Sequence, residues 1–290
     1  MFDKVVIVGV GLLGGSLARD IRHHRLAKTI IGVCRPEQTE NIALKQNVVD
    51  QVLTIDKAMV DADLIVFATP MQTMVPLLKK VESLIHSETL ITDVGSVKTD
   101  LYQQLKGSTP NLLSQFVLTH PIAGGENSGV SASQLALFKN KNVIITETDE
   151  VKNTAIEKIN LLWSKVGARV IKMSLESHDA IFSKTSHLPH VVAFSLVNFI
   201  NQQTNREQLF DLAAAGFYDF TRIASSNAEM WRDICITNKN EVLNALDGFR
   251  GQIDEIREYI NNTDQQNILE YFESAKQARN LGFAKKIKPE

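Results

Sequence analysis

His120 is the residue whose type and position point most directly to chemistry. It follows the apolar segment Phe116 to Thr119 and precedes two glycines, Gly124 and Gly125. A histidine between an apolar strand and a glycine loop is expected at the edge of a sheet rather than in a core. Imidazole is also the side chain best able to accept a proton near neutral pH. We therefore predict that His120 is a general base.

A second feature that could do chemistry is a glycine cluster at the N-terminus. The cluster follows the apolar segment Lys4 to Val8 and opens a helical pattern, which is the context of a dinucleotide-binding loop rather than of an ordinary turn. Such glycines permit a sharp turn, close approach of the pyrophosphate and tight helix packing, and the helix N-terminus stabilises negative charge. The residues predicted to bind the cofactor here are Gly9, Gly11, Leu12, Leu13 and Gly14.

The end of the second predicted strand bears on the choice between NAD and NADP. An acidic residue there would bind the ribose 2′-hydroxyl of NAD, yet Cys34 and Arg35 occupy the position and no acid occurs before Glu37. A guanidinium suits the 2′-phosphate, so the sequence favours NADP. The alternative is that Arg35 is a solvated loop residue and that Glu37 reaches back.

Two more segments end strands at the same predicted edge. Ser96 lies in the segment Asp93 to Lys98, where its hydroxyl either belongs to the site or caps the next helix. Thr69 and Pro70 follow another strand and are predicted to line the nicotinamide. His120 would then take a hydroxyl proton while hydride leaves the same carbon.

Histidines in the second half of the chain are further candidates. His187 and His190 are three residues apart and share a helix face. With His178 they could be imagined as a metal triad, but no nearby carboxylate except Asp179 completes the set, so we predict no metal. A histidine that packs or hydrogen-bonds locally is the ordinary alternative.

Arg222 is the candidate cation of this half. It lies between Phe220 and Ile223, and a guanidinium in apolar surroundings requires a carboxylate partner, for which its planar fork is suited. Trp231, at the start of a long helical stretch, is either a core residue or a pocket wall.

Apolar strands alternating with helices predict a largely parallel sheet covered on both faces. After residues 4–8, the predicted strands are 29–34, 63–68, 89–93, 116–119, 142–146 and 169–173. From residue 175 the strand signal stops, and the predicted helices are 187–201, 207–215 and one long helix from 227 to 260. The fold class is therefore an α/β Rossmann-type dinucleotide-binding domain, residues 1–174, followed by an all-α dimerisation domain, residues 175–290. A second copy is expected to cover the apolar helices, giving a homodimer.

The composition excludes several classes of protein. In 290 residues, 31 basic minus 33 acidic side chains give a net charge of −2, which argues against binding to nucleic acid or to a membrane surface. No stretch of about 20 apolar residues and no signal-peptide pattern occurs. Cys34 and Cys235 are too few for a disulfide scaffold. We predict a reduced, cytoplasmic protein.

Taken together, these segments resemble the prephenate and arogenate dehydrogenase family. The resemblance rests on motifs that occur in the same order over almost the whole chain, to about residue 282. The motifs are Gly9 to Ser16, Asp93 to Lys98, His120 to Gly124, Ser186 to His190, and Gly216 to Ala224 followed by Met230-Trp231.

The resemblance implies oxidative decarboxylation of prephenate to 4-hydroxyphenylpyruvate, with hydride transfer to NAD or NADP, in tyrosine biosynthesis. His120 would hydrogen-bond the ring hydroxyl, Ser96 would orient that hydroxyl and the histidine, and Arg222 would bind the ring carboxylate. The other residues that the resemblance places in the substrate site are His190, His187, Glu126 and Trp231.

One departure from the family leaves the substrate open. Members usually carry Arg or Lys where this chain has Tyr218, so arogenate, or both substrates, is the alternative to prephenate. Rivals of another kind are a different two-domain reductase and a redox sensor that binds the dinucleotide without turnover.

Overall fold

The N-terminal half of the protein is built on one eight-stranded sheet. The computed structural model describes residues 1–34, 37–125 and 127–287, without the side chains of residues 37 and 283–287. The strand order is β3-β2-β1-β4-β5-β6-β7-β8. The strands are β1 Phe2–Val8, β2 Ala27–Val33, β3 Gln51–Val52, β4 Leu64–Phe67, β5 Leu90–Asp93, β6 Phe116–Pro121, β7 Asn142–Thr146 and β8 Arg169–Met173. All neighbours pair in parallel except β6 and β7, so the predicted largely parallel sheet is confirmed.

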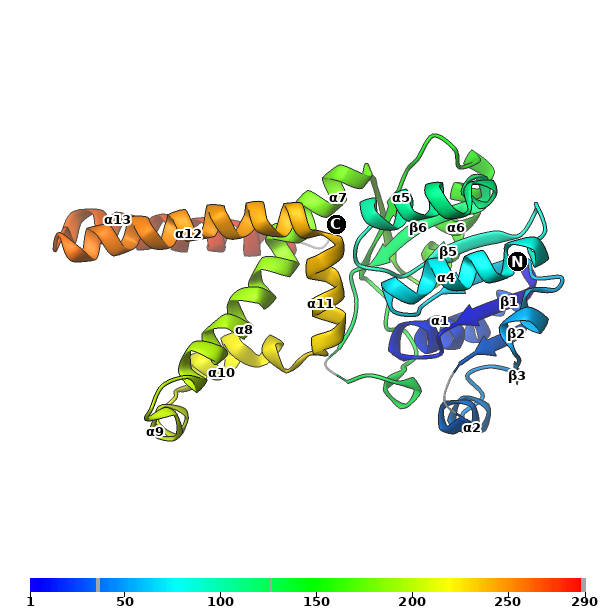
Figure 1. The fold of residues 1–290 in the computed structure, drawn as a ribbon, viewed down its shortest axis with the longest axis horizontal. Coiled ribbons are helices and arrows are strands. Elements are labelled where there is room, and N and C mark those ends of the chain that lie inside the picture. The colour runs from blue at the N-terminus through cyan, green and yellow to red at the C-terminus, as the bar shows by residue number, and fades with distance from the viewer. Residues whose placement is uncertain (35–36, 126, 288–290) are drawn as a thin grey trace. The chain divides into compact units, whose positions relative to one another are not determined.

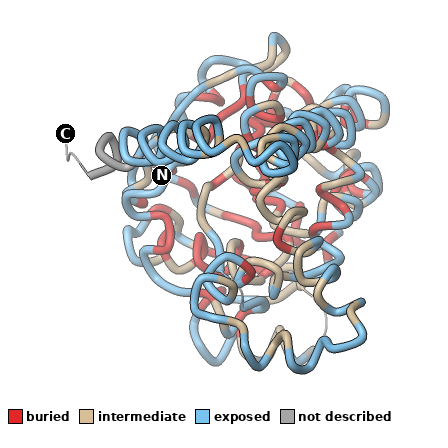
Figure 2. Tube along the Cα trace, turned by 90° about the vertical axis from the view of Figure 1, so that its left-hand side faces the viewer, coloured by how far each residue is buried: buried red, intermediate tan, exposed pale blue. Residues whose placement is uncertain are grey.

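Helices cover both faces of this sheet (Figure 1). The helices are α1 Leu12–His23, α2 Glu37–Lys45, α3 Ile55–Met59, α4 Met71–Val81, α5 Thr99–Ser108 and α6 Asn153–Lys165. Along β1, Val5 and Ile7 pack in the same core as α1 and α6, whereas Val6 and Val8 pack in the core of α3, α4 and α5. Because both faces are covered, the strands read as continuous apolar runs. All residues of β4 and β5 are buried, and Figure 2 shows the buried stretches of the chain.

The second half is helical, as predicted. Its helices are α7 Leu175–Phe182, α8 Leu188–Asn201, α9 Arg206–Asp211, α10 Ala215–Thr221, α11 Ala228–Thr237, α12 Lys239–Asn261 and α13 Gln265–Ile287. A π-helical turn, Ser183–His187, joins α7 to α8. Pro189 lies at the start of α8, directly after this π-helical turn, and it has no backbone N–H to donate back into that turn.

Two helix predictions in this half are wrong. The expected helix 207–215 ends at Asp211, because Ala214 is extended (φ −89°, ψ 170°) and α10 starts after it. The expected single helix 227–260 is interrupted at Asn238 (φ −108°, ψ 33°). The side-chain amide of Asn238 donates instead to the carbonyl of Asp179 (3.1 Å), a competition with helical hydrogen bonding that is typical of asparagine.

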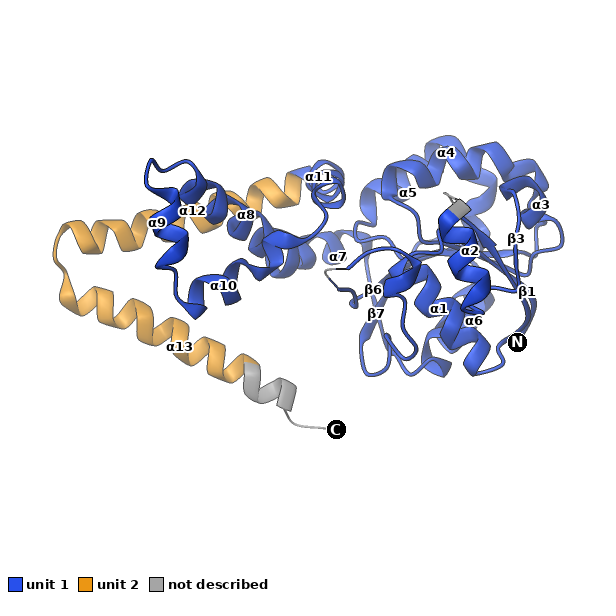
Figure 3. Ribbon diagram, turned by 90° about the horizontal axis from the view of Figure 1, so that it is seen from below, with its two compact units in different colours: residues 1–239 blue, residues 240–290 orange. Residues whose placement is uncertain are grey.

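The packing of the chain defines two compact units, Met1–Lys239 and Asn240–Glu290 (Figure 3). Helices α7 to α11 thus belong to the same unit as the sheet. The predicted domain boundary, between residues 174 and 175, lies where strands give way to helices and not where these two packing units meet. It stays a prediction. Within the described residues, no helix is long and apolar enough to cross a membrane.

In the turn between β1 and α1, two glycines lie where neighbouring backbone leaves no room for a side chain. Gly9 has φ +99°, and a Cβ there would lie 2.6 Å from the carbonyl oxygen of Ala68. A Cβ on Gly14 would lie 2.2 Å from the carbonyl oxygen of Gly9, whereas one on Gly11 would meet nothing within 4 Å. Gly9 and Gly14 therefore allow the backbone to close on itself, and Gly11 leaves open space in front of the helix.

We expect Gly14→Ala to lower the free energy of unfolding by about 1–3 kcal/mol, because backbone must move to admit the methyl group. The measurement is urea denaturation followed by circular dichroism. Gly107→Ala on α5 is the matched control, since a Cβ there meets nothing within 4 Å. Equal stability of the two variants would show that the β1–α1 turn is not tightly closed.

Candidate active site

The carboxyl ends of the parallel strands bring the predicted cofactor segments to one edge. Val8 pairs with Phe67, and Phe67 pairs with Asp93. The residues that follow, Gly9 to Gly14 with Leu12 and Leu13, Thr69 and Pro70, and Val94 to Ser96, therefore leave the sheet side by side. Ligands of such sheets bind at this edge.

Several details of this edge suit a dinucleotide. Gly11 is the N-cap of α1 and supplies no side-chain cap, so no side chain occupies the acceptor position at the helix start. The hydroxyl of Thr69 is buried and has no hydrogen-bond partner within the described chain. A Cβ on Gly125 would lie 3.7 Å from the side chain of Leu12, so the loop after His120 passes close to the start of α1.

Two predicted site residues, Arg35 and Glu126, lie outside the described residues. Cys34, just before Arg35, is half-buried, and burial, followed by the charge of Glu40, raises the pKa of its thiol. The preference for NADP therefore stays a prediction from the sequence.

Ser96 does not cap a helix, so the capping alternative is wrong. Helix α5 begins at Thr99, its N-cap is Lys98, and Ser96 lies before it, half-buried. The acceptor at this helix start is the carboxylate of Asp179. The backbone N–H of Lys98 donates to its Oδ1 (3.0 Å) and that of Thr99 to its Oδ2 (2.9 Å). A carboxylate at a helix N-terminus is favoured by the helix dipole.

His120 is the second-last residue of strand β6. It does not follow the strand as predicted, because β6 continues to Pro121. Its Nδ1 is 2.8 Å from Nε2 of His178, and Nδ1 of His178 is 2.7 Å from Oδ1 of Asp179. The ring of Phe182 packs against both histidines, with centroids 4.9 Å and 4.6 Å away. Burial, then the neighbouring His178 and Lys98, lower the pKa of His120 well below its usual range. His120 is therefore neutral near pH 7 and able to accept a proton.

The cation of the Asp93 to Lys98 segment does not face a ligand. Lys98 is completely buried, and its ammonium group donates to the carboxylate of Asp93 and to the carbonyl of Thr119 (2.7 Å). Asp93 also accepts the backbone N–H groups of Gly95 (2.7 Å) and Thr119 (3.0 Å). Burial lowers the pKa of Lys98, and the charge of Asp93 opposes that shift. This ion pair fixes the ends of β5 and β6, which carry Ser96 and His120.

His187 and His190 have different environments although they share a helical segment. His187 is buried, its Nδ1 lies 3.2 Å from the amide nitrogen of Asn238, and its Nε2 has no partner within the described chain. Burial lowers the pKa of His187 to about 4. His190 stacks on Trp231, with ring centroids 3.7 Å apart, and its Nδ1 lies 2.9 Å from the carbonyl oxygen of Ser186.

Trp231 is a core residue, and its role as a pocket wall stays a prediction. It is buried beside Val97 and Ile234, and one face of its ring supports His190. Its indole N–H donates to the hydroxyl of Ser226 (2.8 Å), which fixes the ring plane.

Arg222 is not in the apolar surroundings that the sequence predicts. It is exposed at the start of the 3-10 turn Arg222–Ser225, and the preceding Phe220 is 47% exposed. Arg222 is nevertheless close enough to His190 for its charge to lower the pKa of that residue, although burial is the larger cause. Tyr218, the departure from the family pattern, donates its hydroxyl to the carbonyl of Phe210 (2.9 Å) and so holds α10 to α9.

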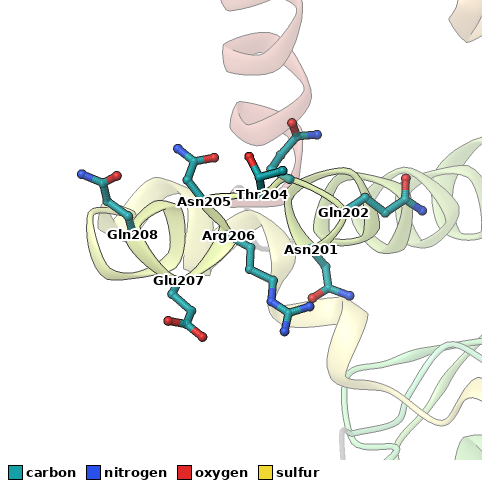
Figure 4. Close-up of a pocket in the computed structure, with 8 residues that line it drawn as sticks. Asn201, Gln202, Thr204, Asn205, Arg206, Glu207 and Gln208 are labelled. Atoms are coloured by element: carbon teal, nitrogen blue, oxygen red, sulfur yellow. The ribbon is translucent and has the colours of Figure 1, made fainter.

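One recess lies away from these residues. The recess at the turn between α8 and α9 is lined by residues 201–208, whose side chains point in different directions from the helix turns (Figure 4). Within the part of the chain that is described, no three His, Cys, Asp or Glu side chains are grouped to hold a metal ion. The strand order brings the glycine turn, Ser96 and His120 to one sheet edge, and that edge is the candidate active site.

Sequence comparison matches almost the whole chain to two family models. "Prephenate dehydrogenase, nucleotide-binding domain" matches residues 17–172, and "Prephenate dehydrogenase, dimerization domain" matches residues 174–274. The chain belongs to the prephenate dehydrogenase family. The predicted family and the predicted fold class are both confirmed.

Individual relatives agree with this family. The prephenate dehydrogenase of Bacillus subtilis is 39% identical over 96% of this chain and 76% of its own length. The cyclohexadienyl dehydrogenase of Zymomonas mobilis is 32% identical over 96% of both chains. A prephenate dehydrogenase from A. aeolicus, in complex with hydroxyphenyl propionate and NAD+, has a TM-score of 0.91 and 35% identity, covering 96% of this chain and 98% of its own.

Sequence reasoning missed the groups that hold His120 in this prephenate dehydrogenase family member. The sequence presents His178 and Asp179 only as possible metal ligands, and it places Asn238 inside a long helix. The adjacent pair His178-Asp179 was a usable signal, because a carboxylate next to a histidine can orient its ring.

We expect Lys98→Met to lower the free energy of unfolding by about 3–5 kcal/mol, because it leaves Asp93 buried and unpaired. Chemical denaturation measures the change. Lys80→Met is the control, since Lys80 pairs with Asp56 at an exposed site and its loss should change stability little. Similar losses in the two variants would mean that the buried pair does not hold the strand ends.

Proposed function

We propose that this chain catalyses the NAD(P)-dependent oxidative decarboxylation of prephenate to 4-hydroxyphenylpyruvate in tyrosine biosynthesis. The observation that carries the proposal is the position of His120. It lies at the sheet edge that also holds the glycine turn, and its ring is held by His178 with Asp179 behind it. A neutral, oriented histidine beside a dinucleotide site suits the removal of a hydroxyl proton during hydride loss.

The residues proposed to hold the cofactor fit a dinucleotide, because the turn closes tightly at Gly9 and Gly14 and is open at Gly11. The full proposed set is Gly9, Gly11, Leu12, Leu13, Gly14, Arg35, Thr69, Pro70 and Ser96. When bound, NAD(P) supplies the hydride acceptor for the ring carbon that bears the hydroxyl.

His120 is the proposed catalytic residue, and Ser96 is proposed to orient it and the substrate hydroxyl. His120 takes the hydroxyl proton as the ring carbon becomes a carbonyl carbon. Carbon dioxide then leaves, and the electron pair of the broken bond moves through the ring to the carbonyl oxygen. That oxygen takes the proton back from His120, and the ring becomes aromatic, which drives the reaction forward. Arg222 is proposed to bind the ring carboxylate, and the pocket would be completed by His190, His187, Glu126 and Trp231.

Arogenate, or both substrates, is the second candidate. A cyclohexadienyl dehydrogenase is among the relatives, at 32% identity, and Tyr218 stands where the family usually has a basic residue. NADP remains the proposed preference, on the basis of Cys34 and Arg35, although the A. aeolicus relative was crystallised with NAD+. A dinucleotide-binding sensor without turnover is the remaining alternative.

We also propose that the protein is a homodimer through its helical domain. The matching family model is a dimerization domain. Large apolar side chains are exposed on α8 to α13, among them Phe199, Leu212, Phe220, Ile236, Phe249, Ile253, Leu269 and Phe272. A second copy that covers them would remove this apolar area from water. The cytoplasmic location stays a prediction from the sequence.

We expect purified protein to reduce the cofactor when given prephenate, as measured by absorbance with NAD and NADP and with prephenate and arogenate side by side. His120→Asn should lower kcat by about 100-fold or more through loss of the base, while cofactor affinity is retained. His86→Asn, at an exposed histidine, is the control. No turnover of either substrate with either cofactor would refute the proposed function.

The pH profile should reflect the lowered pKa of His120. Because only the neutral ring accepts a proton, activity is lost as the pH falls through that pKa, so the acid limb of kcat/KM should lie below about pH 6.5. His187, with a pKa of about 4, stays neutral near pH 7 as well. A limb at or above the usual histidine value would show that His120 is not the base, or that its ring is not buried.

A further inference from the structure

The hydrogen bonds behind His120 determine which ring nitrogen of each histidine carries a proton. Asp179 accepts the backbone N–H groups of Lys98 and Thr99 as well as facing His178. Burial alone would raise the pKa of Asp179, but these hydrogen bonds outweigh it and lower the pKa. Asp179 is therefore an ionised acceptor, and Nδ1 of His178 must donate to it.

The hydrogen bond between His178 and His120 fixes the tautomer of His120 in turn. A neutral His178 that donates from Nδ1 has a lone pair on Nε2. His120, whose Nδ1 lies 2.8 Å from that nitrogen, must then carry its proton on Nδ1. In this tautomer, Nε2 of His120 has a lone pair and can accept a proton.

We propose that His178 and Asp179 are positioning residues that fix the tautomer of His120, so that its Nε2 presents a lone pair to the substrate hydroxyl. This assignment rests on the proposed function for its catalytic meaning, but the tautomers themselves do not depend on it. The proton that leaves the hydroxyl binds Nε2 of His120, and the resulting imidazolium keeps its Nδ1 hydrogen bond to His178.

The surroundings make this arrangement rigid. His178 is completely buried, and Phe182 packs against both rings. Asp179 is fixed by α5 through its carboxylate and by Asn238 through its carbonyl. The helix α7 that carries the pair therefore cannot turn without losing several hydrogen bonds.

The charges near His120 are compatible with its accepting a proton. Lys98 disfavours a positive charge on His120, but Asp93 pairs with Lys98 at the same place. The negative charge of Asp179, which reaches His120 through His178, favours the imidazolium that forms during proton transfer. A carboxylate that orients a histidine base has this double effect in the Ser-His-Asp triad.

The tautomers can be tested in the resting protein without turnover. Long-range 1H–15N correlation spectra of 15N-histidine-labelled protein should show His120 and His178 protonated on Nδ1, with assignments from the spectra of His120→Asn and His178→Gln. A proton on Nε2 of His120 would overturn the proposal. This result stands even if the wild-type protein converts neither prephenate nor arogenate, so the two failures are distinguishable.

Asp179→Asn tests the link to catalysis. An asparagine amide can donate to Nδ1 of His178, which would move the proton of His178 to Nε2 and reverse the tautomer of His120. We expect kcat to fall by about 100- to 10,000-fold, as for the equivalent change in a triad, with KM and cofactor affinity within about threefold of wild type. Asp20→Asn, at a buried carboxylate of α1 that accepts the Ala136 backbone N–H, is the matched control and should retain activity.

Loss of cofactor binding or of helical circular dichroism together with kcat in Asp179→Asn would assign Asp179 a purely structural role and overturn the proposal. An unchanged kcat in Asp179→Asn would also overturn the proposal.

Two substitutions of His178 separate positioning from packing. Glutamine has an oxygen that can accept from Nδ1 of His120, whereas phenylalanine fills the space without an acceptor. We expect His178→Gln to retain at least about ten times the kcat of His178→Phe, because a hydrogen bond to the base is kept. Equal activities would mean that His178 only fills space.

Discussion

The carboxylate of Asp179 is the interaction on which the arrangement of the site depends. A buried carboxylate is costly unless all its lone pairs are satisfied, and here backbone N–H groups at the start of α5 and the ring of His178 satisfy them. These hydrogen bonds connect α7 to α5 and, through His178, to His120 on β6. One side chain from the helical half thus determines where the helices meet the sheet edge and how the candidate base is oriented.

A second buried charge completes this framework. Lys98 and Asp93 are both fully buried and pair with each other, and Asp93 also accepts two backbone N–H groups. Pairs of this kind contribute more to a defined geometry than to net stability, because desolvation offsets most of their attraction. The pair joins the ends of β5 and β6, and its balanced charge leaves the neutral form of His120 favoured mainly by burial.

The net charge of the chain does not reveal which local charges lie near the candidate site. The net charge of the chain is −2, and the buried ammonium group of Lys98 is already paired. Arg222 is exposed, its charge acts on His190, and it is the cation proposed to bind the ring carboxylate. A small anionic molecule requires only such local charge, so near-neutral composition is compatible with membership of the prephenate dehydrogenase family.

The sequence by itself determined the features that depend on neighbouring residues. The glycine spacing, the apolar runs of the strands and the position of His120 at the end of one of them are local, and they predicted the Rossmann-type half, the helical half and the family. The tertiary structure decided what lies behind His120, because His178 is 58 residues further along the chain and its proximity follows from packing alone. It also decided that a predicted helix is interrupted at Asn238, whose side-chain amide donates to the carbonyl of Asp179 and lies beside Nδ1 of His187. Buried polar groups must find partners wherever the fold provides them, and no local pattern specifies those partners.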